Sequence, residues 1–309
     1  MGSVAAAYAY LASRGIPAQA VLPSIYPGFL AFLDPADNPV LIHRDSPRET
    51  LEAISAADLM VCLDFNNLGR TEYLEEAIIS SNAVKVLIDH HIQPDADKFD
   101  IVFSQIEVSS TCELLFKVLM QLSDVDGNVD RLPMQCAEAL YSGMLTDTNN
   151  FANSTWPSTF NMAADLTARG VDTARIRGNI FSSYTEKRMR LMGHMLKDKM
   201  TMVPEMDAAF MLLSNQEKQQ HDFKPGDSEG FVNLPLSIGG VTLSALFTED
   251  SSGEYIRVSL RSKGQRDVNT FSRLFFNGGG HLNASGGRLY MPLGEVPGYF
   301  IKSLKEYGK

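Results

Sequence analysis

The chain lacks any hydrophobic run long enough to span a membrane, and its first residues lack the basic flank of a secretory signal. It has only three cysteines, Cys62, Cys112 and Cys136, and no two of them have the short spacing of a metal clip. Internal repeats and low-complexity tracts are also absent. We therefore expect a cytoplasmic protein with buried, reduced thiols, no membrane partner and no cysteine metal site.

Basic residues are scarce as well. Lys and Arg together number 27 against 37 Asp and Glu, which gives a formal net charge of −10. Long nucleic acids are bound by many basic side chains that displace counterions, so we expect no long nucleic acid as a partner. A small phosphorylated substrate is still compatible with this charge, because divalent cations can supply positive charge locally.

At 309 residues the chain is long enough for two domains, and 44% apolar with 21% charged residues is typical of a globular protein. Residues 1–183 alternate helical patterns with short apolar runs, including a predicted strand at 18–22. From residue 201 onward short strands dominate, and a turn at 250–253 predicts an antiparallel hairpin. We expect the helix within 184–200 to connect a domain at 1–183 to a domain at 201–309.

The most informative stretch is an apolar, β-branched run at 84–88 that stops at Asp89, His90 and His91. Such a run predicts a buried strand of a parallel sheet. Open α/β sheets bind ligands at the carboxyl ends of their strands, where these three side chains would lie. Successive side chains point to different sides, so one imidazole can bind a metal while the next reaches a substrate. The aspartate can then orient a ring.

Two more carboxylates follow predicted elements. Asp64 comes directly after a short apolar strand at 59–63, and Asp147 follows the helical pattern at 134–144. Taken alone, each could be a helix cap or a surface acid. Together with His90 they form an oxygen and imidazole donor set, which suits Mn²⁺ or Mg²⁺, with Zn²⁺ or Fe²⁺ possible. A carboxylate could bridge two such ions and favour phosphoryl chemistry.

The four residues Ser110-Thr111-Cys112-Glu113 have the spacing of a capping box at the start of a helix. The free N–H groups of that helix terminus could hold an anion near the same sheet edge. The alternative is an ordinary cap with no ligand.

A second polar constellation lies near the end of the chain, where Gly278, Gly279 and Gly280 precede His281. Consecutive glycines allow backbone N–H groups to approach a phosphate closely. Arg261, at the end of a predicted strand, could grip a phosphate through its guanidinium. A flexible loop is the alternative for the glycine run, but with the histidine and the arginine it predicts a substrate-binding surface.

Four motifs together resemble the DHH phosphoesterases that carry a DHH-associated (DHHA1) second domain, and the length, the layout and a fifth motif, Ser-Leu-Arg-Ser, resemble the bifunctional oligoribonuclease and 3′-phosphoadenosine 5′-phosphate phosphatase branch. The motifs are Asp64 after its strand, Leu-Ile-Asp-His-His at 87–91, Thr-Asp-Thr at 146–148, Ser-Leu-Arg-Ser at 259–262, and Gly-Gly-Gly-His at 278–281. The resemblance covers nearly the whole chain. It implies an α/β protein of two domains with a cleft between them: a mainly parallel-sheet DHH domain with a metal centre and a smaller mixed α/β DHHA1 domain that binds substrate.

The resemblance also implies roles for the first-domain residues. Asp64 would bridge two manganese ions, with magnesium possible, and His90 and Asp147 would be further ligands. His91 would contact the scissile phosphate, and Asp89 would support the histidines.

In the second domain, Arg261, Gly278, Gly279, Gly280 and His281 would hold the substrate. The family's first motif, a strand followed by a histidine and two aspartates, would precede the first helix and is absent from this sequence. We expect Met-Gly-Ser at 1–3 to be its tail, as if the start were assigned at an internal methionine.

The function implied is a metal-dependent phosphoesterase that degrades very short oligoribonucleotides to 5′-mononucleotides and dephosphorylates 3′,5′-bisphosphoadenosine. The alternatives are a linear or cyclic dinucleotide phosphodiesterase, and a nucleotide-binding protein whose catalysis is impaired because the first motif is absent. Partners would be short oligoribonucleotides or small phosphorylated nucleotides, with a homodimer possible.

Overall fold

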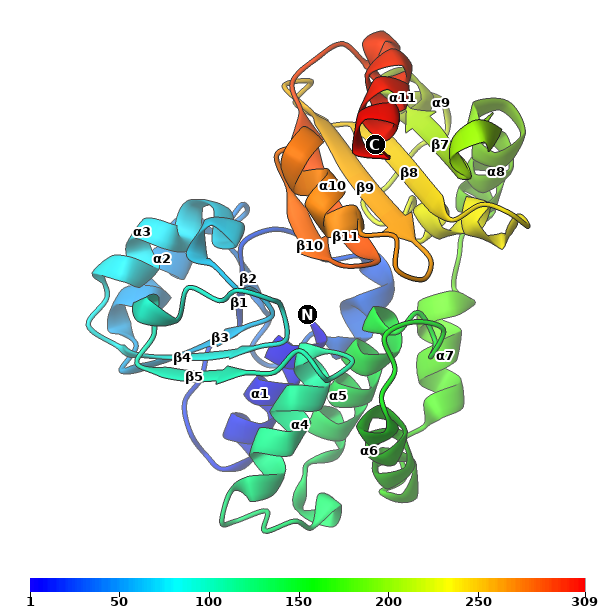
Figure 1. The fold of residues 1–309 in the computed structure, drawn as a ribbon. Coiled ribbons are helices and arrows are strands. Elements are labelled where there is room, and N and C mark those ends of the chain that lie inside the picture. Colours follow the sequence, from blue (N-terminus) through cyan, green and yellow to red (C-terminus); the bar gives the residue numbers. More distant parts are fainter. Residues whose placement is uncertain (309) are drawn as a thin grey trace. The chain divides into compact units, whose positions relative to one another are not determined.

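A computed structural model describes residues 1–308 of the chain. The chain divides into two compact units, residues 1–183 and the part from Tyr184 onward (Figure 1). Each unit has its own hydrophobic core, so each is described by itself.

The first unit is built from seven helices and five strands among the described residues. Their bounds are α1 (Gly2–Ser13), β1 (Val21–Leu22), β2 (Leu41–Ile42), α2 (Pro47–Ala56), β3 (Leu59–Leu63), α3 (Glu75–Ser80), β4 (Val84–Asp89), β5 (Ile101–Ser104), α4 (Thr111–Gln121), α5 (Met134–Asp147), α6 (Pro157–Ala168) and α7 (Thr173–Phe181). Strands β3, β4 and β5 form a parallel sheet, in that order.

The predicted strand at 18–22 is shorter than expected. Only Val21–Leu22 is a strand, and it pairs in parallel with Leu41–Ile42 as a small separate sheet. The preceding residues Ala18, Gln19 and Ala20 have little β propensity, so the apolar pattern alone overestimated the length of the strand.

Helices cover both faces of the parallel sheet, which explains why its strands are apolar without alternation. Leu63 and Ile88 point into a core shared with helices α1, α4 and α5. Cys62 and Leu87, their neighbours in the chain, belong to the opposite core with residues of α2 and α3. Figure 1 shows the two groups of helices on the two sides of β3, β4 and β5. This three-layer arrangement leaves the carboxyl edge of the sheet as the place where polar side chains can gather.

Helix α1 packs closely along α5 because glycine and alanine line their contact. A Cβ at Gly2 would lie 2.8 Å from the Cα of Gly143, and a Cβ at Gly143 would lie 2.2 Å from the Sγ of Cys112 on α4. Backbones can approach this closely only where side chains are missing. Cys112 and Cys136 are both buried here as free thiols, in agreement with the prediction from the sequence.

The second unit has one mixed sheet with helices on both faces. Its bounds are α8 (Glu186–His194), β6 (Thr201–Val203), β7 (Ala208–Leu213), α9 (Asn215–Gln220), β8 (Leu243–Glu249), β9 (Ile256–Ser262), α10 (Val268–Phe275), β10 (Gly279–His281), β11 (Ala284–Leu289) and α11 (Val296–Tyr307), with a π-helical turn at Met195–Lys199 after α8. The strand order is β10-β11-β9-β8-β7-β6, and only β7 and β8 are parallel. Helices α10 and α11 cover one face through a phenylalanine-rich core.

The predicted hairpin is present. Strands β8 and β9 are antiparallel, and the backbone N–H of Asp250 donates to the carbonyl of Tyr255 across the turn. Gly253 adopts a φ of +77° within that turn, a conformation that favours glycine. None of the helices described in residues 1–308 combines the length and apolar character needed to cross a membrane.

We predict that Gly143→Ala lowers the free energy of unfolding by about 2 kcal/mol, because the new methyl group collides with Cys112 where the helices cannot easily separate. In a Cys112→Ala background the same substitution should cost at least about 1 kcal/mol less, since the nearest remaining atom is a Cβ 3.3 Å away.

Gly178→Ala is the matched control. Gly178 lies within α7 with no atom near its missing Cβ, so this change should leave stability unchanged or raise it by about 0.5–1 kcal/mol. Urea denaturation of the four variants measures these differences. Equal effects of Gly143→Ala in both backgrounds would show that the close contact is not the cause.

Candidate active site

The pairing of β3 with β4 places two polar segments at one edge of the sheet. Leu63 is aligned with Ile88, so Asp64 and Asp89 both emerge where their strands end. Asp64 has a φ of +71°, a left-handed conformation that costs free energy for a residue with a side chain. Its backbone N–H donates to the carbonyl of Ile88 at 3.3 Å, which holds it there. Such strain occurs preferentially at functional sites.

Three of the predicted ligand residues meet at this edge. The Nε2 atom of His90 lies 3.7 Å from Oδ1 of Asp64 and 3.8 Å from Oδ2 of Asp147, which is the last residue of α5. One ligand atom from each residue lies within 4.8 Å of the others. Two ligand atoms that bind one ion at about 2.1 Å are at most about 4.2 Å apart, so the set fits a single divalent cation after small movements.

The electrostatics of this group also fit a cation. Burial of the carboxylate, and next the nearby charge of Asp64, raise the pKa of Asp147 well above its ordinary value. Because the Asp147 side chain is 36% accessible, repulsion between the two carboxylates accounts for its raised pKa better than burial does. Burial lowers the pKa of His90, although Asp64 opposes that shift, which keeps the imidazole neutral and able to bind a metal.

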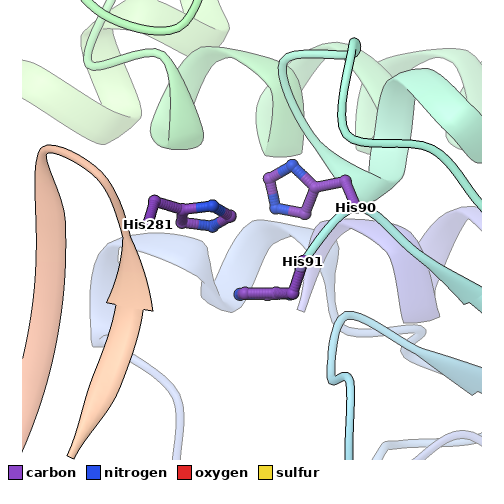
Figure 2. Close-up of side chains that lie close together, drawn as sticks. All are labelled: His90, His91 and His281. Atoms are coloured by element: carbon purple, nitrogen blue, oxygen red, sulfur yellow. The ribbon is translucent and has the colours of Figure 1, made fainter. Parts of the chain in front are cut away.

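His91 is oriented by Asp89 rather than by a neighbouring strand. The fully buried Asp89 carboxylate lies 2.7 Å from Nδ1 of His91 and accepts the backbone N–H of His91 at 3.0 Å. Burial would raise the pKa of Asp89, but these contacts outweigh it and lower the pKa. With a proton on Nδ1 donated to Asp89, Nε2 is the ring nitrogen that carries the lone pair. Figure 2 shows the His90 and His91 rings in different planes, and they meet in a T-shaped arrangement with centroids 4.8 Å apart.

A second donor set shares one residue with the first. Asp64, Asp89 and His91 also present ligand atoms within 4.8 Å of one another. Asp64 is therefore common to both sets, the position that a bridging carboxylate takes in a two-metal site.

Thr111 and a small cavity complete the surroundings of Asp64. The Thr111 hydroxyl, at the start of α4, donates to Oδ1 of Asp64 at 2.9 Å. Beside it lies a cavity of about 70 Å³ that is lined by Asp64, Thr111 and Asp147 on its polar side and by Leu30 and Leu33 among its apolar residues. The volume is enough for about two water molecules.

Glu113 has a larger role than its place in a capping box predicts. The Ser110 hydroxyl does accept the backbone N–H of Glu113, at 3.1 Å, as expected for the cap. The fully buried Glu113 carboxylate, however, accepts from the backbone and hydroxyl of Ser109 and from the hydroxyls of Ser158 and Thr159 on α6. Burial would raise the pKa of Glu113, but these donors lower it. The link to α6 joins residues 45 apart in the chain, which no local pattern reveals.

Gly279 and Gly280 of the glycine run lie in a strand, which excludes the flexible-loop alternative for them, while their predicted part in substrate binding stays a prediction. Gly279–His281 forms β10 and pairs with β11, and the N–H of Gly280 donates to the Asn269 side chain. A Cβ at Gly278 would lie 1.9 Å from the carbonyl oxygen of Gly286. These glycines therefore allow close packing of the hairpin.

Arg261 and His281 share one face of the second sheet. Both are aligned with Ala284, Arg261 from β9 and His281 from β10. Residues aligned across neighbouring strands point to the same side, and two strand spacings separate them by about 10 Å. The guanidinium of Arg261 donates to the carbonyl of Leu260 at 2.9 Å. Figure 2 labels His281 on its strand.

Comparison with known proteins identifies the family. The model of the DHH family N-terminal domain matches residues 1–144, and the DHHA1 domain model matches residues 208–303. A solved exopolyphosphatase-related protein from Bacteroides fragilis is 35% identical, with a TM-score of 0.89 over 99% of this chain and 88% of that one. The chain belongs to the DHH family. The mixed α/β fold, with a parallel sheet in the DHH domain and a mixed sheet in the DHHA1 domain, confirms the predicted fold class.

Curated relatives of this DHH-family protein hydrolyse phosphate esters. A protein of Streptococcus mutans named as a probable bifunctional oligoribonuclease and PAP phosphatase, NrnA, is 28% identical over 75% of this chain and 70% of its own length. The cyclic-di-AMP phosphodiesterase GdpP of Geobacillus thermodenitrificans is 25% identical over 84% of this chain but only 38% of its own length. The family match and these names support a hydrolase of the phosphoesterase type, and DHH-family hydrolases depend on metal ions.

We predict that Glu113→Gln lowers the free energy of unfolding at pH 7 by about 1–3 kcal/mol, because an amide presents N–H donors to groups that are themselves donors. Since the pKa of Glu113 is lowered by folding, its contribution is present above the unfolded value of about 4.3 and is lost as the pH falls below it.

The unaltered protein and Glu113→Gln should therefore differ fully in free energy of unfolding above about pH 5.5. This difference should shrink as the pH falls through about 4, as measured by urea denaturation. The control is Glu52→Gln, which changes an exposed helix-surface pair and should matter by less than about 0.5 kcal/mol. A pH-independent deficit would mean that packing, rather than the charge, stabilises this region.

Proposed function

We propose that this protein is a manganese-dependent phosphoesterase that releases 5′-mononucleotides from very short oligoribonucleotides and dephosphorylates 3′,5′-bisphosphoadenosine. The observation that carries the proposal is the meeting of Asp64, His90 and Asp147, with an oriented His91 beside them. Carboxylate and imidazole ligands without thiolate suit Mn²⁺, with Mg²⁺ as the second choice. The likeness to NrnA supports the substrate class.

Each first-unit residue has a proposed role. Asp64, His90 and Asp147 would hold the metal, with Asp64 as the carboxylate that two ions would share. A divalent cation bound there supplies charge neutralisation for a phosphoryl group and activates water. Asp89 accepts the Nδ1 proton of His91 and so holds its Nε2 edge toward the scissile phosphate.

In the second unit, Arg261 and His281 are proposed to bind substrate phosphate from their shared sheet face. The run Gly278, Gly279 and Gly280 contributes by allowing the hairpin that carries His281 to lie close to β11, rather than by offering a ring of N–H groups. The small number of basic residues favours a short substrate.

A dinucleotide phosphodiesterase is the second candidate. The likeness to GdpP favours it, because that protein is named for cleaving cyclic-di-AMP and aligns with most of this chain. Both candidates use the same proposed metal centre, so only the choice of substrate separates them.

The deciding experiment incubates the purified chain and Mn²⁺ with oligoribonucleotides of two to five residues, 3′,5′-bisphosphoadenosine, linear diadenylate and cyclic diadenylate. We expect mononucleotides from the short RNAs and AMP from the bisphosphate, with the cyclic compound intact, as measured by chromatography. Cleavage of the cyclic compound alone would favour the second candidate. Nucleotide binding without any turnover would favour the binding-protein alternative.

Metal binding gives a separate prediction. Asp64→Asn and Asp147→Asn should each weaken Mn²⁺ binding at least about tenfold in calorimetric titration and abolish turnover, because each removes an anionic ligand. In the metal-free protein at pH 7, Asp147→Asn should leave the melting temperature unchanged or raise it, because it removes the repulsion between the carboxylates.

Asp97→Asn is the control for charge alone. Its side chain is 76% accessible and pairs with Lys98, so its removal should alter neither metal affinity nor turnover. Chelation with EDTA should abolish the activity of the unaltered protein, and Mn²⁺ should restore it. Unchanged Mn²⁺ affinity in both site variants would refute the proposed ligand set.

A further inference from the structure

The segment after Asp147 is strained and aromatic. Asn149, Asn150, Phe151 and Ser154 all have left-handed φ values, between +47° and +64°. Such conformations are uncommon for residues with side chains and persist where the surrounding structure holds them. Here the Thr148 hydroxyl accepts the backbone N–H of Phe151 at 3.0 Å. The constraint fixes Phe151 one turn beyond the candidate ligand.

Phe151 is one member of an aromatic platform, which we define as Phe151, Trp156 and Phe160. The rings of Phe151 and Phe160 are stacked, with centroids 5.6 Å apart and an interplanar angle of 20°. Phe151 packs partly against the core. Phe160 is 53% exposed and Trp156 39% exposed, so two large aromatic side chains of the platform face solvent.

The first turn of α6, which carries Phe160, is fixed to the region of the carboxylate pair. Thr159 and Ser158, its preceding residues, donate to the buried Glu113 carboxylate. Two residues before Glu113, Thr111 donates to Asp64. The platform is therefore tied to the candidate metal site along two routes, through Phe151 to Asp147 and through Glu113 to Asp64.

We propose that Phe160 is the surface on which the base of the bound nucleotide stacks, with Phe151 supporting its ring from behind. This inference rests on the proposed function, because it assumes that a nucleotide phosphate lies at the carboxylate pair. Stacking on an aromatic ring suits every base, since each base has a π-face, and it holds the nucleotide without basic residues. The scarcity of basic residues makes such a contribution to binding important.

The test compares Phe160→Leu with the unaltered chain on two substrates, diadenylate and a dinucleotide analogue whose corresponding position is abasic. We expect the KM for diadenylate to rise about tenfold in the variant, while turnover of the abasic analogue is unchanged. Tyr73→Leu is the matched control, because Tyr73 is a 78% exposed aromatic residue on a different element, and it should change neither value.

Binding can be followed without turnover. Trp156 is the only tryptophan of the chain, so its fluorescence reports on the platform. Titration of the protein with AMP in the presence of Mn²⁺ should quench this fluorescence in the unaltered chain, and the apparent affinity should fall about tenfold in Phe160→Leu.

The outcomes separate the two proposals. If the unaltered chain cleaves diadenylate and Phe160→Leu does so with the same KM, the stacking role is wrong and the proposed function stands. An equal loss on both substrates would also overturn it, because the base would not be what Phe160 contacts. If the unaltered chain cleaves neither substrate, the proposed function fails, and AMP quenching that depends on Phe160 would still support the platform.

Discussion

Parallel pairing of β3 with β4 is the constraint on which the candidate site depends. The register that aligns Leu63 with Ile88 ends both strands at one edge of the sheet. Asp89, His90 and His91 after β4 therefore lie about one strand spacing from Asp64 after β3. Helices on both faces of the sheet hold this register through two separate cores. A shift of one residue in the strand register would move each side chain of the shifted strand to the opposite face of the sheet. It would also separate the candidate metal-donor side chains from one another.

Around this edge the protein retains features that cost stability. Asp64 is in a left-handed conformation, and its carboxylate lies near that of Asp147, whose pKa is raised. The repulsion between the carboxylates is unfavourable in the metal-free chain and would be relieved by a cation bound between them, whereas the backbone strain at Asp64 is compensated by the surrounding structure. The buried Glu113 carboxylate, with donors from Ser109, Ser158 and Thr159, compensates by fixing α4 to α6.

The two units contribute different chemical groups to the proposed function. Acidic and imidazole groups gather in the first, whereas a guanidinium and an imidazole share a sheet face in the second. The glycines of 278–280 also have a packing role that the sequence did not predict. Their missing side chains let β10 approach β11 and α10, and this packing positions His281.

Local pattern determined much of this protein. Strands 59–63 and 84–89, most helices and the candidate ligands Asp64, His90 and Asp147 follow from apolar runs that end in polar residues, because burial requires such runs and excludes charge. The sequence predicted that Asp89 orients an imidazole, but only the tertiary structure decided that this ring is His91, that Glu113 joins α4 to α6, and that Phe160 stacks on Phe151. These contacts depend on backbone direction after a strand end and on packing between distant segments, which no short window of sequence contains.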